Sequence, residues 1–142
     1  MNEYKGKTVV TFGVFDLLHY GHFEFFRRMR ELVGESGRVY VMLQIDEWVS
    51  KFKDAKLVYD FEKRRKMIET LRTVTCVFPY ESVCVEALQD VDFDVLAVGP
   101  EHTGERFQTL FAWCRMHGKE VVVLPRTDGI STTVLKETIK AM

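Results

Sequence analysis

The sequence predicts one α/β domain over residues 1–142, with a five-stranded parallel sheet covered by helices on both faces. Three observations lead to this fold class. Short β-rich runs alternate with longer stretches of helical period. The strand runs are continuously apolar, which is typical of parallel strands buried on both sides. No linker, composition break or repeat divides the chain, so a single domain is expected.

Composition excludes several classes of protein. The chain has 20 Lys and Arg against 21 Asp and Glu, a net charge of −1, and is 46% hydrophobic. These values exclude disordered and collagen-like chains, and they argue against nucleic-acid binding and against a polybasic membrane module. No apolar run reaches the roughly 18 residues of a membrane helix, and no signal peptide is evident. Three scattered cysteines without ligand spacing favour a cytoplasmic location.

The first strand and helix are expected at Lys7–Gly13 and His22–Val33. The strand contains β-branched and aromatic residues, and the helix carries an apolar stripe at 3/4 spacing. That stripe consists of Phe23, Phe26, Met29 and Val33. Gly34 and Gly37 are expected to end the helix.

The next strand is expected at Arg38–Gln44, followed by a loop at Lys51–Lys56, where no period is evident. Asp60 can cap a helix that runs to about Arg72. Helical spacing places Arg64 on the inward face of this helix. The other members of that face are Phe61, Ile68 and Leu71. A buried arginine is costly unless paired, so either a phosphate or a carboxylate is expected beside it.

The remaining elements continue the alternation. Strands are expected at Cys76–Pro79, Val95–Val98 and Glu120–Leu124, and helices at Val83–Val91, Arg106–His117 and Thr132–Ala141. Gly118 closes the helix before the last strand. The aromatic stretch Phe107–Trp113 fits either a dimer contact or, as the more common use, the core.

In a parallel sheet, ligands bind beyond the carboxyl ends of the strands, and the first such segment is Thr11–His22, TFGVFDLLHYGH. Gly13 leaves room for a ligand or a sharp turn. His19 and His22 face the same way on a helical first turn, and Gly21 lets backbone amides approach an anion. These features favour a polyphosphate site. The alternatives are two surface histidines or a metal site, for which no third ligand is near in sequence.

Three other segments follow strands. Arg126–Thr133, RTDGISTT, offers a guanidinium fork and hydroxyls at a helix start, so it is either a second half of the phosphate site or a plain cap. Gly99–Gly104 places Glu101 and His102 where a base could be recognised, or forms a solvent loop. Lys51–Arg65 is rich in Lys and Arg and is either a phosphate clamp or a solvated face.

These segments resemble the HxGH nucleotidyltransferase superfamily, through His19-Tyr20-Gly21-His22 and Ile130-Ser131-Thr132-Thr133. The resemblance spans essentially the whole chain and is strongest to the glycerol-3-phosphate cytidylyltransferase family. It implies a Rossmann-like sheet of order 3-2-1-4-5 and transfer of CMP from CTP to glycerol 3-phosphate, releasing pyrophosphate. It further implies Mg²⁺, no organic cofactor, and a homodimer.

The resemblance also implies roles for single residues. His19, His22 and Arg126 hold the CTP phosphates, while Lys51 and Lys53 clamp the phosphates and the acceptor. Arg64 faces the acceptor phosphate. Mg²⁺ is bound mainly through the nucleotide phosphates, with Asp16 as a candidate contact. The implied nucleotide-binding residues are Phe12, Gly13, Val14, Phe15, Asp16, Gly21, Gly99, Glu101, Thr127, Ile130, Ser131 and Thr132.

The chain departs from the family's pattern at three sites: Val14 replaces a threonine, Pro100-Glu101 replaces an acidic pair, and His102 stands where an aromatic such as Trp is expected. They concern base and acceptor recognition. The alternatives are therefore an adenylyltransferase similar to FAD synthetase or to a sugar-phosphate adenylyltransferase, and a non-catalytic nucleotide-binding module. A redox enzyme is disfavoured because the chain has no GxGxxG.

Overall fold

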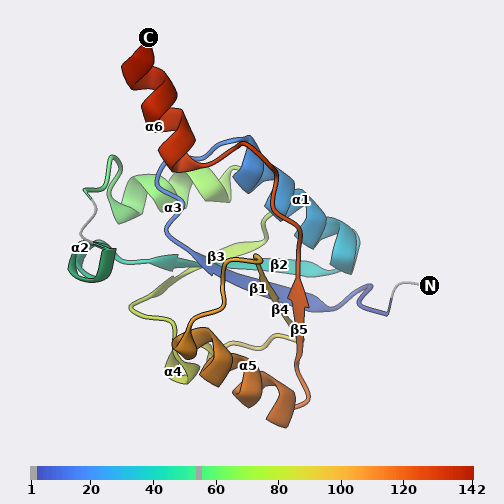
Figure 1. The fold of residues 1–142 in the computed structure, drawn as a ribbon. Helices are drawn as coiled ribbons and strands as arrows, with labels where there is room; N and C mark the ends of the chain where they lie inside the picture. Colours follow the sequence, from blue (N-terminus) through green and yellow to red (C-terminus); the bar gives the residue numbers. More distant parts are fainter. Residues whose placement is uncertain (1–2, 54–55) are drawn as a thin grey trace.

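In the computed structural model, which describes residues 3–53 and 56–142, five parallel strands form one sheet of order β3-β2-β1-β4-β5 (Figure 1). Of residues 50–53 only the backbone is described. The strands are β1 (Thr8–Gly13), β2 (Arg38–Gln44), β3 (Cys76–Tyr80), β4 (Val95–Val98) and β5 (Glu120–Val123). All neighbouring strands pair in parallel, so the predicted sheet and its order are confirmed.

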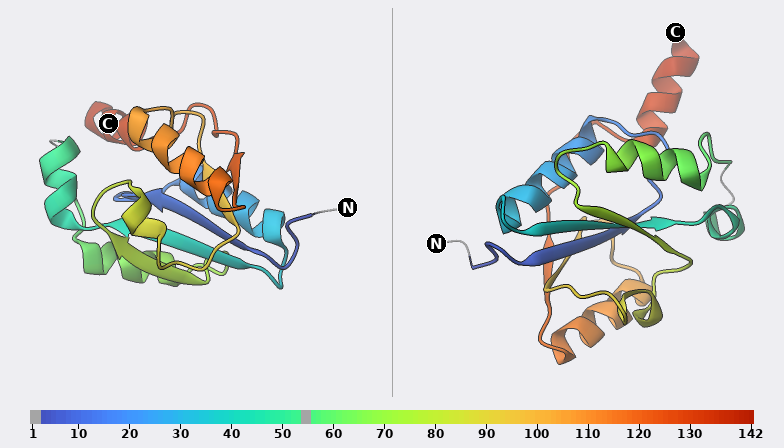
Figure 2. Two further views of the ribbon diagram at one scale, coloured as in Figure 1. Left: turned by 90° about the horizontal axis from the view of Figure 1, so that it is seen from below. Right: turned by 180° about the vertical axis from the view of Figure 1, so that it is seen from behind.

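Helices cover both faces of this sheet, as expected. They are α1 (Tyr20–Val33), α2 (Asp46–Lys53), α3 (Phe61–Glu69), α4 (Val85–Leu88), α5 (Glu105–Met116) and α6 (Thr132–Ala141). Helices α1 and α3 lie on one face, and α4 and α5 on the other (Figure 2). Helix α6 projects away from the body. Within the described ranges, no helix is both long and apolar enough to cross a membrane.

Each face of the sheet has its own apolar core. Val9 packs with Phe26, Met29 and Val33 of α1, whereas its neighbour Val10 packs with α4 and α5. This two-sided burial explains why the strands are continuously apolar. Phe23 was expected in the α1 stripe but is 41% exposed, because a 3.6-residue turn rotates it away from the other three members.

Two predicted elements were wrong in extent. The loop expected at Lys51–Lys56 overlaps α2, which extends to Lys53. Acidic residues in the first turn of α2 and the buried Val49 favour this helix. The helix expected at Val83–Val91 is the four-residue α4, because the amide of Val91 bonds back to the carbonyl of Leu88 and closes the turn.

Other boundaries follow the sequence closely. Asp60 caps α3 by accepting a hydrogen bond from the amide of Lys63 at 3.0 Å, although α3 ends at Glu69 and not at Arg72. Gly34 and Gly118 terminate α1 and α5 with φ of 73° and 72°, a conformation that glycine adopts without strain. The stretch Phe107–Trp113 packs into the core against β4 and β5.

Candidate functional site

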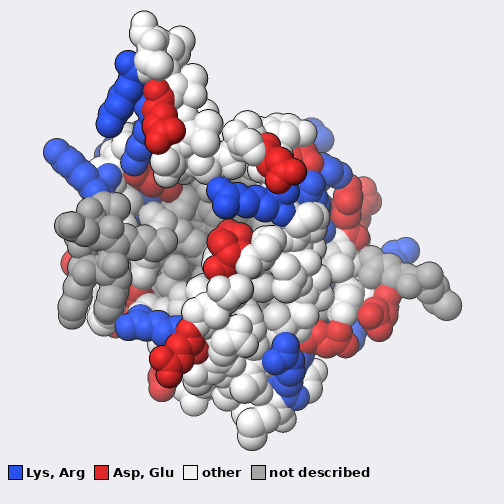
Figure 3. Space-filling view, in the orientation of Figure 1, with Lys and Arg blue, Asp and Glu red and all other residues white. Residues whose placement is uncertain are grey.

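A cavity of about 530 Å³ opens at the carboxyl edge of the sheet, between the ends of β1, β4 and β5 and the starts of α1 and α6. The hollow is visible beside α6, with both basic and acidic side chains at its rim (Figure 3). It brings together segments that are more than 100 residues apart in the chain. The predicted residues that line it are Phe12, Gly13, Val14, Phe15, Asp16, His19, Gly21, His22, Gly99, Glu101, His102, Arg126, Thr127, Ile130, Ser131, Thr132 and Thr133.

The two histidines form a reciprocal cap at the start of α1. The Nδ1 atom of His19 accepts a hydrogen bond from the amide of Gly21 at 3.1 Å, and the Nδ1 atom of His22 accepts one from the amide of His19 at 3.3 Å. The rings are stacked with centroids 3.8 Å apart. Because each Nδ1 is an acceptor, each neutral ring carries its proton on Nε2. The pair therefore offers two Nε2–H donors beside the cavity.

Burial and neighbouring charge keep both histidines neutral. Burial, and then the proximity of His19, lower the pKa of His22 from 6.5 to about 4. Burial and the charge of Arg126 also lower the pKa of His19. At neutral pH both rings are therefore uncharged hydrogen-bond donors, and they line the same cavity as Arg126 of the last segment.

Gly13 makes room for a side chain of the protein. A Cβ at Gly13 would lie 2.4 Å from the ring of Phe15. Phe15 has a φ of 48°, in the left-handed region that non-glycine residues rarely occupy. Its ring contacts His22 at 5.2 Å between centroids and Phe26 at 5.1 Å. Gly13 thus allows the turn that brings Phe15 against His22, and because Gly13 also lines the cavity, its role in leaving room for a ligand stays a prediction.

The segment after β5 is held at the start of α6. The hydroxyl oxygen of Ser131 accepts a hydrogen bond from the amide of Val134 at 3.1 Å and caps the helix. Gly129 supplies the preceding turn with a φ of 75°. Arg126 is exposed and lines the cavity. The cap interpretation is therefore confirmed, and the same segment places Arg126 at the cavity, so the phosphate-site interpretation stays a prediction that is compatible with the cap.

The segment after β4 folds Glu101 and His102 against one another. The Nδ1 atom of His102 accepts a hydrogen bond from the amide of Gly99 at 3.1 Å, and its Nε2 atom lies 3.8 Å from the carboxylate of Glu101. The imidazole stacks on Phe107 at 4.6 Å. A Cβ at Gly99 would lie 2.6 Å from that same carboxylate. Gly99 therefore allows Glu101 to fold over the backbone at the rim of the cavity.

Arg64 is held by protein groups. It is inward, as the spacing predicts, and only 1% exposed. Its guanidinium donates to the carbonyl of Tyr59 at 3.1 Å, the carbonyl of Val14 at 2.9 Å and the carboxylate of Asp46 at 2.6 Å. Of the two partners expected beside this buried arginine, a phosphate or a carboxylate, the structure shows the carboxylate, and a role of Arg64 toward the acceptor phosphate stays a prediction.

Asp16 lines the cavity but is bound on both oxygens. They accept hydrogen bonds from the amides of Val58 and Tyr59 at 2.7 and 2.8 Å. Among the residues that the structure describes, no group of three or more His, Cys, Asp or Glu is placed to hold a metal. This donor set fits a cation held mainly by phosphates and water, with Asp16 as one of the two carboxylates that line the cavity beside Glu101.

Two basic residues of the cavity were missed from the sequence. Lys56 belongs to the basic run and lines the cavity, while Lys63 and Arg65 from the same run form ion pairs on the surface of α3. Lys136 lies one turn after Thr132 on α6, so helical spacing could have identified it. The side chains of Lys51 and Lys53 lie outside the described residues.

Comparison with known proteins identifies a family. The family model described as cytidylyltransferase-like matches residues 10–138. The chain is 39% identical over 133 residues to glycerol-3-phosphate cytidylyltransferase of Staphylococcus aureus, with 92% of this chain and 93% of that protein covered. It is 37% identical to glycerol-3-phosphate cytidylyltransferase of Bacillus subtilis, with 96% and 99% covered.

More distant similarities extend to other proteins. FAD synthase of Korarchaeum cryptofilum is 27% identical over 142 residues, with 95% of this chain and 93% of that protein covered. A lipopolysaccharide core biosynthesis protein of Thermoplasma volcanium has a similar structure, with a TM-score of 0.68, 20% sequence identity, and 85% of this chain and 96% of that chain covered. The structural similarity confirms the fold.

Proposed function

The chain belongs to the cytidylyltransferase-like family, and from that premise we propose that it transfers CMP from CTP to glycerol 3-phosphate, giving CDP-glycerol and pyrophosphate. The observation that carries this proposal is the convergence of the neutral His19–His22 pair and Arg126 on one cavity at the carboxyl edge of the sheet. Two neutral N–H donors placed around the guanidinium of Arg126 suit the binding of a polyphosphate.

The proposed reaction is an in-line displacement at the α-phosphorus. An oxygen of the acceptor phosphate attacks, the bond to the bridging oxygen of the leaving group breaks, and pyrophosphate departs. The acceptor is already an anion at neutral pH, so no general base is required, and the protein contributes positioning and charge stabilisation. The Nε2–H groups of His19 and His22 and the guanidinium of Arg126 stabilise the charge on the phosphates.

The acceptor side of the site involves α2. We assign Lys51 and Lys53 to the acceptor phosphate, as the family resemblance implies, and their backbone lies in the last turn of α2. Arg64 serves this side indirectly, because its partner Asp46 is the first residue of the same helix. Arg64 is thus a positioning residue in this proposal.

The proposed reaction uses Mg²⁺, which neutralises phosphate charge when it is bound with the nucleotide, and no organic cofactor. The residues fit such an ion when the phosphates and water supply most of its ligands, and Asp16 is the carboxylate of the β1–α1 segment that lines the cavity.

We also expect a cytoplasmic location. The unpaired thiols of Cys76, Cys84 and Cys114 support a reducing compartment.

A pyrophosphate-release screen tests the proposal, with four nucleoside triphosphates against phosphorylated acceptors that include glycerol 3-phosphate, other polyol phosphates and phosphonates. We expect pyrophosphate to be released when CTP and glycerol 3-phosphate are both present. We expect no release when glycerol is supplied in place of glycerol 3-phosphate. Release with ATP but not CTP would overturn the assignment of the base. It would favour an adenylyltransferase, the activity suggested by the 27% identity to an FAD synthase.

The proposed enzyme acts as a homodimer, an expectation that comes from the family. Helix α6 supports a further contact, because none of its side chains is buried and Val134 and Ile139 are 41% and 63% exposed. Sedimentation equilibrium decides the oligomeric state, and a mass of 16.6 kDa in solution would contradict the dimer.

A further inference from the structure

The segment 125–130, which carries Arg126, leaves the sheet with little support of its own. The amide of Leu124 donates to the carbonyl of Val98 at 2.8 Å, and the chain then runs without helix or strand until α6 begins at Thr132. Helix α6 has no buried side chain, so it cannot fix the segment from its far end. Something else must hold Arg126 opposite His19.

Arg28 of α1 reaches across to this segment. Its Nη1 atom donates to the carbonyl of Pro125 at 2.9 Å and lies 3.5 Å from the hydroxyl oxygen of Thr127. These two residues flank Arg126. The same helix carries His19 at its N-cap. One guanidinium group therefore links the helix that presents the histidines to the segment that presents Arg126.

The link is made by one side chain at two points. Arg28 donates to a carbonyl on one side of Arg126 and lies within hydrogen-bond distance of a hydroxyl on the other side. At the other end of the segment, the side chain of Ile130 lies over Gly21, 3.5 Å from where a Cβ would be. Arg28 thus fixes the first half of the segment and Ile130 the second half.

Arg28 acts from behind the cavity wall. It lines a shallow hollow on the outer surface together with Tyr4 and Leu32, and this hollow shares Leu124 and Pro125 with the main cavity. Arg28 itself is not among the residues that line the main cavity. Any effect of Arg28 on a bound nucleotide must therefore be transmitted by Pro125 and Thr127, which it contacts and which line the main cavity.

We propose that Arg28 is a positioning residue for the nucleotide phosphates, because it fixes Pro125 and Thr127 and thereby aims Arg126 at the site of His19 and His22. This inference deepens the proposed function and rests on it for its kinetic readout. It concerns a residue whose side chain does not line the main cavity.

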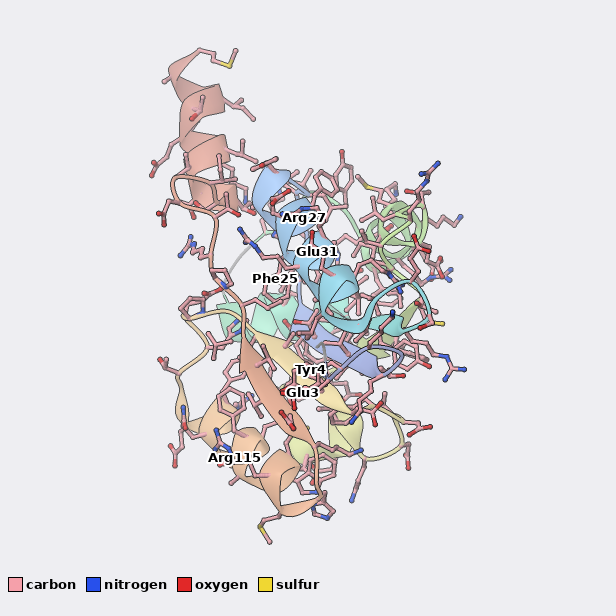
Figure 4. The ribbon with its side chains drawn as sticks, turned by 90° about the vertical axis from the view of Figure 1, so that its right-hand side faces the viewer. Glu3, Tyr4, Phe25, Arg27, Glu31 and Arg115 are labelled. Atoms are coloured by element: carbon pink, nitrogen blue, oxygen red, sulfur yellow. The ribbon has the colours of Figure 1, made fainter. Side chains whose placement is uncertain are left out.

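The test compares Arg28→Ala and Arg28→Lys with the wild-type chain, and Arg27→Ala is the matched control. Arg27 is the preceding residue. It pairs with Glu24 and with Glu31 of its own helix, and Figure 4 shows Arg27 and Glu31 on α1. In Arg28→Ala we expect the KM for CTP to rise about tenfold, the equivalent of one lost charged hydrogen bond. The KM for glycerol 3-phosphate should stay within about twofold.

The lysine variant and a double variant separate positioning from a loss of folded protein. Arg28→Lys retains a donor for the carbonyl of Pro125 and should recover most of the affinity for CTP. In an Arg126→Ala background, Arg28→Ala should add less than about twofold to KM, because the two changes act through one contact. Lower stability alone would reduce the apparent kcat and would not raise the KM for one substrate.

Backbone hydrogen exchange of residues 127–131, measured without nucleotide, gives a readout independent of activity. We expect faster exchange in Arg28→Ala and wild-type exchange in Arg27→Ala. A wild-type KM for CTP in Arg28→Ala overturns the inference whatever the exchange rates. If the wild-type protein is inactive with every nucleotide, the proposed function fails, and unchanged exchange in Arg28→Ala then overturns the anchoring role as well.

Discussion

The guanidinium of Arg64 lies 2.6 Å from the carboxylate of Asp46, and this ion pair joins the start of α3 to the start of α2. The side chain of Arg64 is 0% exposed, whereas that of Asp46 is 40% exposed. Arg64 also donates to the carbonyl of Val14, in the segment that leads to the histidines. The pair therefore connects both substrate sides of the proposed site.

Removing Asp46 should destabilise the fold, because Arg64 would keep its charge in a buried position without its carboxylate partner. We expect Asp46→Ala to lower the free energy of unfolding by about 1–2 kcal/mol, less than the roughly 3 kcal/mol of a fully buried pair, because the carboxylate of Asp46 is 40% exposed and water screens the pair. Urea unfolding measures this. Glu47→Ala, at the exposed neighbouring position, is the control and should change stability by less than about 0.5 kcal/mol. Equal losses in both variants would contradict the role assigned to the pair.

Removing the ring of His22 should impair turnover. His22→Ala deletes one of the two Nε2–H donors, and we expect kcat to fall about 10²-fold or more, the scale for a preorganised donor to a charged transition state. Steady-state pyrophosphate release measures kcat. His117→Ala, an exposed histidine stacked on Trp113 outside the cavity lining, should retain wild-type turnover. A decrease of less than about fivefold in His22→Ala would refute the assigned role.

Stability should depend on pH through His22. Folding lowers its pKa from 6.5 to about 4, so the unfolded chain takes up a proton first as the pH falls. The free energy of unfolding should therefore drop between about pH 7 and pH 4, by about 3 kcal/mol from this residue, and the effect should level off below pH 4. Urea midpoints across this range measure the drop. His22→Gln should show a shallower decline than the wild-type chain, and identical slopes would contradict the burial of a neutral ring.

Gly99 should control the position of Glu101. Gly99→Ala places a Cβ where the carboxylate lies at 2.6 Å, so the carboxylate must move while the fold is preserved. We expect a change in stability below about 1 kcal/mol but a several-fold rise in the KM for the nucleotide. Kinetics with CTP and ATP measure both affinity and base preference. In a Glu101→Ala background the same substitution should have no further effect, and a rise in KM there would refute the explanation.

The sequence by itself determined the parallel sheet and most of the cavity, whereas the strand order came from the family resemblance. Continuously apolar strands require two covered faces, and parallel strands bring their carboxyl ends to one edge, so the positions of His19, Arg126 and Ser131 follow from local pattern and topology. The inward placement of Arg64 also follows from its helical spacing.

Only the tertiary structure decided which side chains and backbone groups of separate elements contact one another. Sequence spacing places Arg64 inward but does not say that Asp46 and Val14 satisfy it, because those contacts cross between separate elements. The room beside Gly13 is taken by Phe15, and the link from Arg28 to Pro125 spans 97 residues. Local periodicity describes one element at a time, whereas hydrogen bonds between elements depend on how the helices dock on the sheet. That docking brings the segments proposed to bind phosphate around one cavity.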